Sequence, residues 1–113
     1  MDETTETARK LAGSLKNNEK YKKYLESLGL VKNDPKLFER LSLYKKKQTS
    51  LEIRRLQGYN ITFDEEKYLS HLYAEIMLNE TIKRFLADED EFLKLYNDII
   101  ETVDSAVEIE IIG

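Results

Sequence analysis

The residues that could bind a metal ion in this chain are few and lie on segments with helical spacing. The single histidine, His71, precedes Glu75 by four residues, so a helix would place both side chains on one face as half of a metal site. A surface pair is the commoner outcome at this spacing, and we expect it here. The acidic run 88–91 lacks the spaced oxygen ligands and the turn glycine of a calcium loop. We therefore predict no metal site.

The same search predicts no catalytic residue and no cofactor. The chain has no cysteine, which excludes a thiol nucleophile, a disulfide, a zinc–thiolate site and a cysteine-bound iron–sulfur cluster. No serine lies in a Gly-x-Ser-x-Gly turn. The glycines at 13, 29, 58 and 113 are isolated, so no glycine-rich phosphate loop is present. We predict that the protein is not an enzyme.

One carboxylate, Glu89, interrupts an apolar stripe with helical spacing. The stripe, with steps of three and four residues, contains Ile82, Phe85, Glu89, Phe92, Tyr96, Ile99 and Val103. A buried Glu89 would need a donor, or its pKa would rise. Candidate donors are the hydroxyls of Tyr21, Tyr24 and Tyr44 and the amides of Asn18 and Gln48. We favour a structural role, in which Glu89 fixes helix register or reaches solvent at the stripe's edge, over a catalytic acid or a carboxylate–metal site.

Charge is unevenly distributed although the net charge is only −4. Residues 32–55 hold eight basic and three acidic side chains, whereas residues 75–113 hold three basic and eleven acidic ones. Two oppositely charged helices side by side, in one chain or across a dimer, would explain this distribution. A nucleic-acid face is the alternative, and it would use Lys45, Lys46, Lys47, Arg54 and Arg55. The net negative charge disfavours binding to phosphates, so we expect no nucleic-acid partner.

Apolar spacing and end signals predict four helical segments, at about residues 5–28, 34–57, 63–78 and 80–106. The first is expected to start near Thr4 or Thr5 and to stop at Gly29. Asn17 and Asn18 weaken its middle. We favour one long helix there over two helices with an asparagine cap at a bend.

The other helix ends carry clearer signals. Asp34-Pro35 is a cap followed by proline at the first helical position. Thr62 and Glu65 have the spacing of a capping box, and Asn79 is the expected cap of the last helix. The short connector after Gly58 makes the second and third segments an antiparallel hairpin.

These elements predict an all-α fold, namely an antiparallel bundle of three to four helices with long first, second and last helices. We expect a single domain over residues 1–113, since this length suits one core. Such a thin bundle leaves apolar surface, for which self-association as a homodimer is the simplest cover. The residues expected at interfaces are Leu51, Ile53, Leu56, Val107, Ile109 and Ile111.

The apolar tail 107–113 alternates apolar and acidic residues, a period of two. A tail folded onto the bundle, a frayed extension of the last helix and a short strand that pairs with another chain all fit this pattern. Elsewhere no apolar run approaches the length of a membrane span, and the N-terminus is acidic rather than signal-like. We expect a cytoplasmic protein with no membrane contact.

An ordered set of short motifs resembles a known family. In chain order these are Ala8-Arg9-Lys10-Leu11, Asn18-x-x-Tyr21-x-x-Tyr24, Asp34-Pro35, Gln48, Gln57-Gly58, Asn79 and Phe85-x-Ala87-Asp88-Glu89. Their order and spacing over residues 8 to 106 resemble the YlbF/YmcA family of Firmicutes, which includes the YheA-like proteins.

The resemblance implies an all-helical cytoplasmic regulatory protein without enzymatic activity. Relatives join a complex that supports competence, sporulation and biofilm development and that modulates mRNA processing by RNase Y. Some relatives carry cysteines that bring iron–sulfur clusters to this complex. The present chain has no cysteine, so that role does not transfer, and a YheA-like paralogue with another role fits equally well. No catalytic residues carry over.

Overall fold

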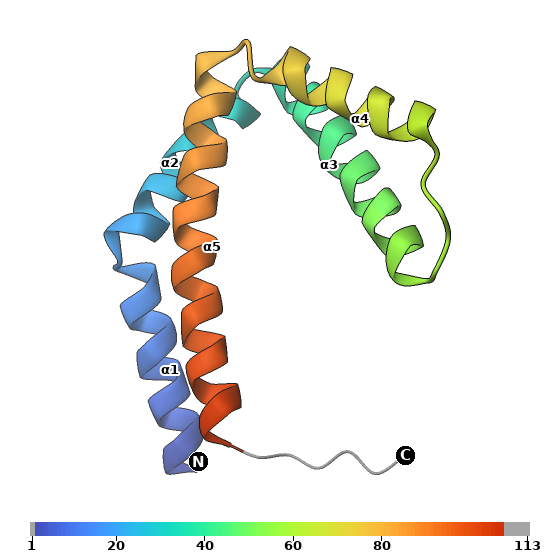
Figure 1. The fold of residues 1–113 in the computed structure, drawn as a ribbon. Helices are drawn as coiled ribbons and strands as arrows, with labels where there is room; N and C mark the ends of the chain where they lie inside the picture. The colour runs from blue at the N-terminus through green and yellow to red at the C-terminus, as the bar shows by residue number, and fades with distance from the viewer. Residues whose placement is uncertain (1, 108–113) are drawn as a thin grey trace. The chain divides into compact units, whose positions relative to one another are not determined.

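The computed structural model describes residues 2–107, which form five helices (Figure 1). The helices are α1 (Glu3–Lys16), α2 (Glu19–Lys32), α3 (Pro35–Leu56), α4 (Phe63–Ile76) and α5 (Glu80–Ala106). No strand occurs between residues 2 and 107. The all-α class is therefore confirmed, whereas the predicted count of three to four helices is wrong.

The additional helix arises from a break at Asn17 and Asn18, where we favoured one continuous helix. The backbone N–H groups of these residues still donate to Gly13 and Leu15, at 3.2 and 3.1 Å. The Asn18 side-chain Oδ1, however, accepts from the Lys20 N–H at 2.9 Å and so caps α2. Asparagine favours such breaks because its amide competes with the backbone for hydrogen bonds. The two-helix alternative is the one that the structure adopts.

Two other predicted helix ends are also wrong. α1 begins earlier, because Asp2 rather than Thr4 or Thr5 is the cap and accepts from the Thr4 N–H at 2.7 Å. α2 continues through Gly29 to Lys32. Its last turn includes Val31, which is fully buried. Burial of a valine side chain contributes about 1.5–3 kcal/mol, more than the roughly 1 kcal/mol that glycine costs inside a helix.

The remaining helix ends follow their sequence signals. Asp34 Oδ1 accepts from the N–H groups of Lys36 and Leu37, at 3.2 and 3.3 Å, and Pro35 starts α3. Thr62 and Glu65 form the predicted capping box of α4. The Asn79 side chain accepts from the Ile82 N–H at 3.1 Å. Local hydrogen-bonding chemistry therefore sets these three helix starts.

The chain divides into two compact units. The terminal unit comprises Met1–Leu25 with Ala87–Gly113, and the central unit comprises Glu26–Leu86. The predicted single domain stays a prediction.

The central unit contains the predicted antiparallel hairpin, formed by α3 and α4 (Figure 1). Gly58, with φ of +87°, lies in the connector, a conformation that favours glycine. Farther along the hairpin the rings of Tyr44 and Tyr73 lie 5.5 Å apart, and Arg40 pairs with Glu75 at 3.6 Å. The buried residues of this unit are Ser27, Val31, Leu41, Tyr44, Leu51, Ile76, Ile82 and Phe85.

In the terminal unit α1 runs antiparallel to the second half of α5 (Figure 1). Leu11 of α1 lies with Ile99 and Val103 of α5 around a shallow hollow. Between residues 2 and 25 and between 87 and 107 no side chain is fully buried. This pairing therefore covers only part of the apolar stripe of α5.

None of the helices within residues 2–107 combines the length and the apolar character that crossing a bilayer would require.

The break between α1 and α2 generates a stability prediction. We expect Asn18→Ala to lower the free energy of unfolding by about 1 kcal/mol, because it removes the cap of α2. Asn17→Ala is the matched control, since Asn17 ends α1, where its side chain donates to the Gly13 carbonyl at 3.2 Å, and bonds no N–H group at the start of α2. Urea unfolding followed by circular dichroism measures both. Equal effects, or a gain in stability from Asn18→Ala, would contradict a capping role.

Candidate interaction surfaces

His71 and Glu75, which we expected to form a surface pair, do not pair with each other. His71 is exposed on α4, and Glu75 instead forms an ion pair with Arg40 of α3 at 3.6 Å. No cluster of three or more histidine, aspartate or glutamate side chains suited to a metal ion occurs within residues 2–107. Glu75 therefore supports the α3–α4 hairpin.

Glu89 lies half-buried in the terminal unit, next to a tyrosine that we named as a candidate partner. Burial raises the pKa of Tyr24, and the negative charge of Glu89 raises it further, with a smaller effect from Tyr21. A negative charge disfavours ionisation of the phenol, so the Glu89 carboxylate and Tyr24 are coupled electrostatically. The structural role of Glu89 stays a prediction.

An aromatic cluster connects the start of α2 to α5. The Phe92 ring lies 5.0 Å from Tyr21, 5.5 Å from Tyr24 and 6.2 Å from Tyr96. Tyr21 and Tyr24 stack at 6.3 Å. Such ring pairs add stabilisation beyond the area that they bury. Phe92, which contacts all three tyrosines, is therefore the main attachment of α2 within the terminal unit.

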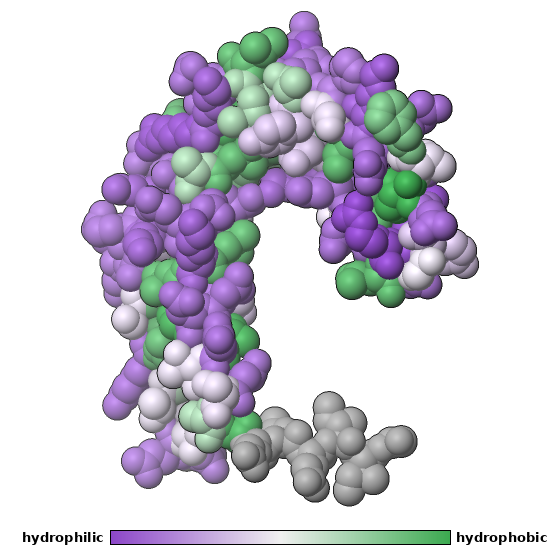
Figure 2. All heavy atoms as spheres, in the orientation of Figure 1, coloured by the Kyte–Doolittle hydropathy of each residue, from purple (hydrophilic) through white to green (hydrophobic). Residues whose placement is uncertain are grey.

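The second half of α5 carries an apolar ridge that its own unit leaves exposed. We define the α5 ridge as Leu93, Tyr96, Ile100, Val103 and Val107, which follow Glu89 in alternating steps of four and three residues. Their exposed fractions are 44%, 43%, 43%, 52% and 53%. Figure 2 shows apolar side chains at the surface of this part of the molecule. Of the apolar stripe along α5, only its start at Ile82 and Phe85 is buried.

The surroundings of the α5 ridge are strongly acidic. Between Ala87 and Val107 the chain holds seven acidic residues and one basic residue, Lys94, which pairs with Asp90 at 2.9 Å. Asp104 lies next to the ridge on its exposed side, at the helical spacing beside Ile100 and Val103. The ridge is thus an apolar strip beside carboxylates.

In the central unit, α3 presents a second exposed face with the opposite charge. We define the α3 outer face as Phe38, Leu43, Lys46 and Ile53, on the side of the helix away from buried Leu41, Tyr44 and Leu51. Phe38, Leu43 and Ile53 are 40%, 47% and 49% exposed. Two shallow grooves of about 520 and 510 Å³ lie along this face, and Lys46 lines both.

The predicted interface residues therefore have different environments. Leu51 is buried in the central core with 3% exposure, so its assignment to an interface is corrected, because the helix turns it toward α4. Ile53 and Leu56 are 49% and 79% exposed, and Val107 belongs to the α5 ridge. The proposed interface residues Ile109 and Ile111, with most of the alternating tail, lie outside the described residues.

The five basic residues of the predicted nucleic-acid face point to different neighbours. The Lys45 ammonium lies 6.0 Å from the centre of the Phe85 ring, and that of Lys47 lies 5.8 Å from the Tyr68 ring. Lys45 and Lys46 both line one groove of the α3 outer face, and Lys46 also lines the other. The structure therefore brings two of the three consecutive lysines to one groove, and Lys47 lies apart from them.

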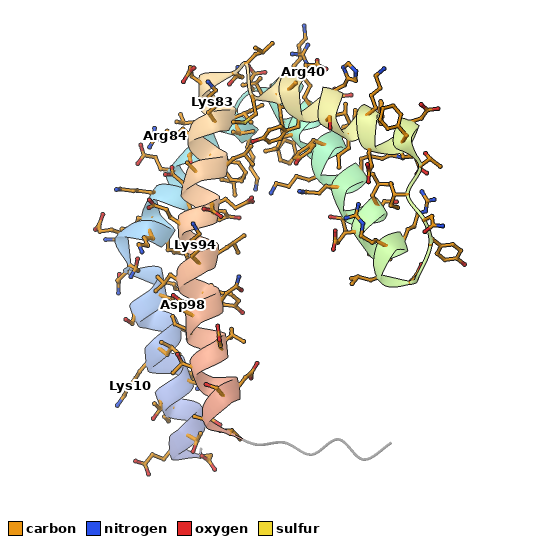
Figure 3. The ribbon with its side chains drawn as sticks, viewed as in Figure 1. Lys10, Arg40, Lys83, Arg84, Lys94 and Asp98 are labelled. Atoms are coloured by element: carbon orange, nitrogen blue, oxygen red, sulfur yellow. The ribbon has the colours of Figure 1, made fainter. Side chains whose placement is uncertain are left out.

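The two arginines of this set face carboxylates of the hairpin. Figure 3 draws the side chains along α3 and α4. The two terminal guanidinium nitrogens of Arg54 contact Glu65, one of them at 3.4 Å. This bond, with help from Thr62, holds the pKa of Glu65 below its ordinary value. Arg55 contacts Glu52 at 3.3 Å and Glu66 at 3.6 Å. Both arginines thus contribute to hairpin structure.

The two exposed faces were not recognised from the sequence. For the α5 ridge a signal existed, because steps of four and three residues from Glu89 to Val107 give the 3.5-residue spacing of helices that pack against a partner helix. On α3, Phe38 is 40% exposed although it adjoins the apolar positions Leu37 and Leu41. Sequence spacing alone did not separate these neighbouring faces.

Comparison with known proteins identifies a family for this chain. A family model described as "Control of competence regulator ComK, YlbF/YmcA" matches residues 4–108. The chain belongs to this YlbF/YmcA family. The predicted resemblance is thereby confirmed. No solved structure gives a significant match to this YlbF/YmcA chain.

Individual relatives are similar over nearly their whole length. A UPF0342 protein of Caldicellulosiruptor saccharolyticus is 32% identical over 110 residues, which cover 97% of this chain and 92% of that protein. A UPF0342 protein of Caldicellulosiruptor bescii is 31% identical with the same coverage. One of Symbiobacterium thermophilum is 25% identical over 104 residues, covering 92% of this chain and 93% of that protein.

Phe92 and Leu93 are adjacent in α5 but have different roles. Phe92 attaches α2, whereas Leu93 lies on the exposed ridge. We expect Phe92→Ala to lower the free energy of unfolding by about 2 kcal/mol, less than for a fully buried phenylalanine because the side chain is half-buried. The matched control, Leu93→Ala, removes a side chain of the ridge and should change the stability of the dilute protein by under about 1 kcal/mol. Urea unfolding at low protein concentration measures both, and equal losses would contradict the assigned roles.

Proposed function

We propose that this protein is a non-enzymatic interaction module that acts in the cytoplasm as a homodimer within a regulatory complex. As in the regulatory relatives described above, the complex would support competence, sporulation and biofilm development and would act on RNase Y-dependent mRNA processing. The observation that carries the proposal is the exposed α5 ridge in a chain of this family.

The physical support comes from the apolar area that the chain leaves uncovered. Scattered exposed apolar residues are ordinary, but a contiguous strip marks a surface that meets another protein. The ridge has the composition of an interface centre, with aliphatic side chains and one tyrosine. A protein with such a surface gains stability when a partner covers it, which suits an adaptor in a complex.

The family supports the regulatory part of the proposal. The matching family is described by its role in the control of a competence regulator. The relatives that we compared are named only as UPF0342 proteins, so they add no activity. Competence control is therefore the best-supported part, and the other processes extend it by family resemblance.

The proposal predicts a dimer that depends on the α5 ridge. Light scattering should give twice the chain mass of 13.3 kDa, and Ile100→Glu should weaken association by tenfold or more, since a buried unpaired charge costs more than about 1.4 kcal/mol. Leu78→Glu is the control, because Leu78 is 84% exposed outside both surfaces. The wild-type protein should also capture a reproducible set of regulatory proteins from a native lysate. A monomer at all concentrations, or capture at background level only, would contradict the proposal.

One observation favours a second function, an RNA-contacting helper. α3 holds seven basic residues, Lys36, Arg40, Lys45, Lys46, Lys47, Arg54 and Arg55, and two acidic ones, Glu39 and Glu52. A helix with this balance attracts phosphates when its cations point to solvent. The contacts of Arg54 and Arg55 with carboxylates make it the weaker candidate.

A salt titration separates the two functions. We expect filter binding to single-stranded RNA to be weak, with no steep loss of affinity as salt rises. Phosphate contacts would instead lower the affinity about tenfold or more between 50 and 200 mM salt, because counterions are released. Lys46→Gln tests the residue that lines both grooves, with Lys16→Gln on α1 as the control. A steep salt dependence that Lys46→Gln reduces would establish the RNA function.

A further inference from the structure

We propose that the α5 ridge of one copy packs on the α3 outer face of a second copy. The inference rests on the homodimer in the proposed function and specifies which surfaces meet. Both faces are exposed in the single chain, one in each unit, and each consists of apolar residues along one side of a helix. The proposed occupant of the α3 grooves is therefore the chain's own last helix, supplied by the partner.

The two surfaces match in length. The α5 ridge with Glu89 covers 18 residues of rise, or about 27 Å, and the α3 outer face from Phe38 to Ile53 covers 15, or about 22 Å. The 3.5-residue spacing of the ridge is the one that lets side chains of one helix fit between those of another over several turns. The grooves at Lys46 provide the corresponding hollows.

Charge disfavours the simplest alternative, in which two α5 helices pair with each other. Such a contact would bring two segments together that each hold seven acidic residues and one basic residue. Like charges at a dry helix contact repel, and a symmetric pair cannot avoid them.

Charge favours α3 as the partner. Arg40, Arg54 and Arg55 of α3 pair with carboxylates of α4, so the positive charge of the outer face comes mainly from lysines. Lys45 and Lys46 line one groove, and Lys32 and Lys46 line the other beside Glu39. The two surfaces are therefore complementary in two respects. Apolar side chains would meet apolar side chains, and the carboxylates beside the ridge would meet the lysines of the outer face. Under a two-fold axis the same contact forms twice, which doubles the buried area.

Chemical cross-linking tests which faces meet, because the chain has no cysteine of its own. An Ile100→Cys chain with an affinity tag is mixed with an untagged Ile53→Cys chain, and a short bis-maleimide is added after exchange. We expect the mixed product to exceed both like-with-like products several-fold. Leu78→Cys mixed with Ile53→Cys is the control and should give only background. Dominant Ile100–Ile100 linkage would overturn the inference in favour of paired α5 helices.

A charge reversal gives a second, independent outcome. Asp104→Lys should weaken the dimer several-fold if the ridge meets basic α3, whereas it should strengthen a dimer of paired α5 helices by relieving repulsion. Lys46→Glu should weaken the dimer as well, and the two changes together should restore part of the loss. Strengthening by Asp104→Lys overturns the inference.

The outcomes distinguish failure of the inference from failure of the proposed function. A monomeric mass for the wild type removes both. A dimeric mass with linkage between two Ile100→Cys chains, or with no linkage to Ile53→Cys, removes only the assignment of faces. A chain with both cysteines that becomes linked within itself at monomer mass shows that α3 is covered by its own α5, which also overturns the inference.

Discussion

The apolar stripe of α5 is longer than the part of it that the rest of the chain covers, and much of the structure follows from this mismatch. At its start, Ile82 and Phe85 are buried in the central unit. Farther along, α1 covers one side only, and the ridge from Leu93 to Val107 stays about half exposed. A helix of 27 residues is held as one element by its hydrogen bonds, so the ridge must be covered by a further surface or tolerate water. The proposed association would cover this exposed part of α5.

Features that depend on neighbours in sequence were predictable. The starts of α3, α4 and α5 follow from Asp34, Thr62 and Asn79, because a capping side chain bonds to N–H groups two or three residues away. The break at Asn18 was visible as an alternative, since its cap is equally local. The helix end predicted at Gly29 was wrong because burial of Val31, a tertiary effect, extends the helix past this glycine. The helix starts were therefore determined by local hydrogen bonds, whereas the position of a helix end was partly determined by packing.

The surfaces were less predictable for the same reason. Leu51 and Ile53 are two residues apart and similar in character, yet one is 3% exposed and the other 49%, depending on where α4 lies. Lys45, Lys46 and Lys47 form one run in sequence but meet a phenylalanine ring, an open groove and a tyrosine ring. Helical geometry spreads consecutive residues around the axis, so a basic run does not make a basic face. The partner that an arginine contacts, such as Glu65 for Arg54, appears only once the hairpin has formed.

An uncovered ridge also links the folding of the terminal unit to association. With no fully buried side chain between residues 2 and 25 or between 87 and 107, this unit gains less from hydrophobic burial than the central unit does. Any partner that binds only the folded form adds stability that grows with its concentration, so covering the ridge would stabilise α1 and the second half of α5 together. The aromatic contacts of Phe92 keep α2 attached meanwhile, so the ridge is already formed when a partner arrives. An exposed but already formed surface suits the proposed regulatory module, because a partner that covers it would add stability to the terminal unit.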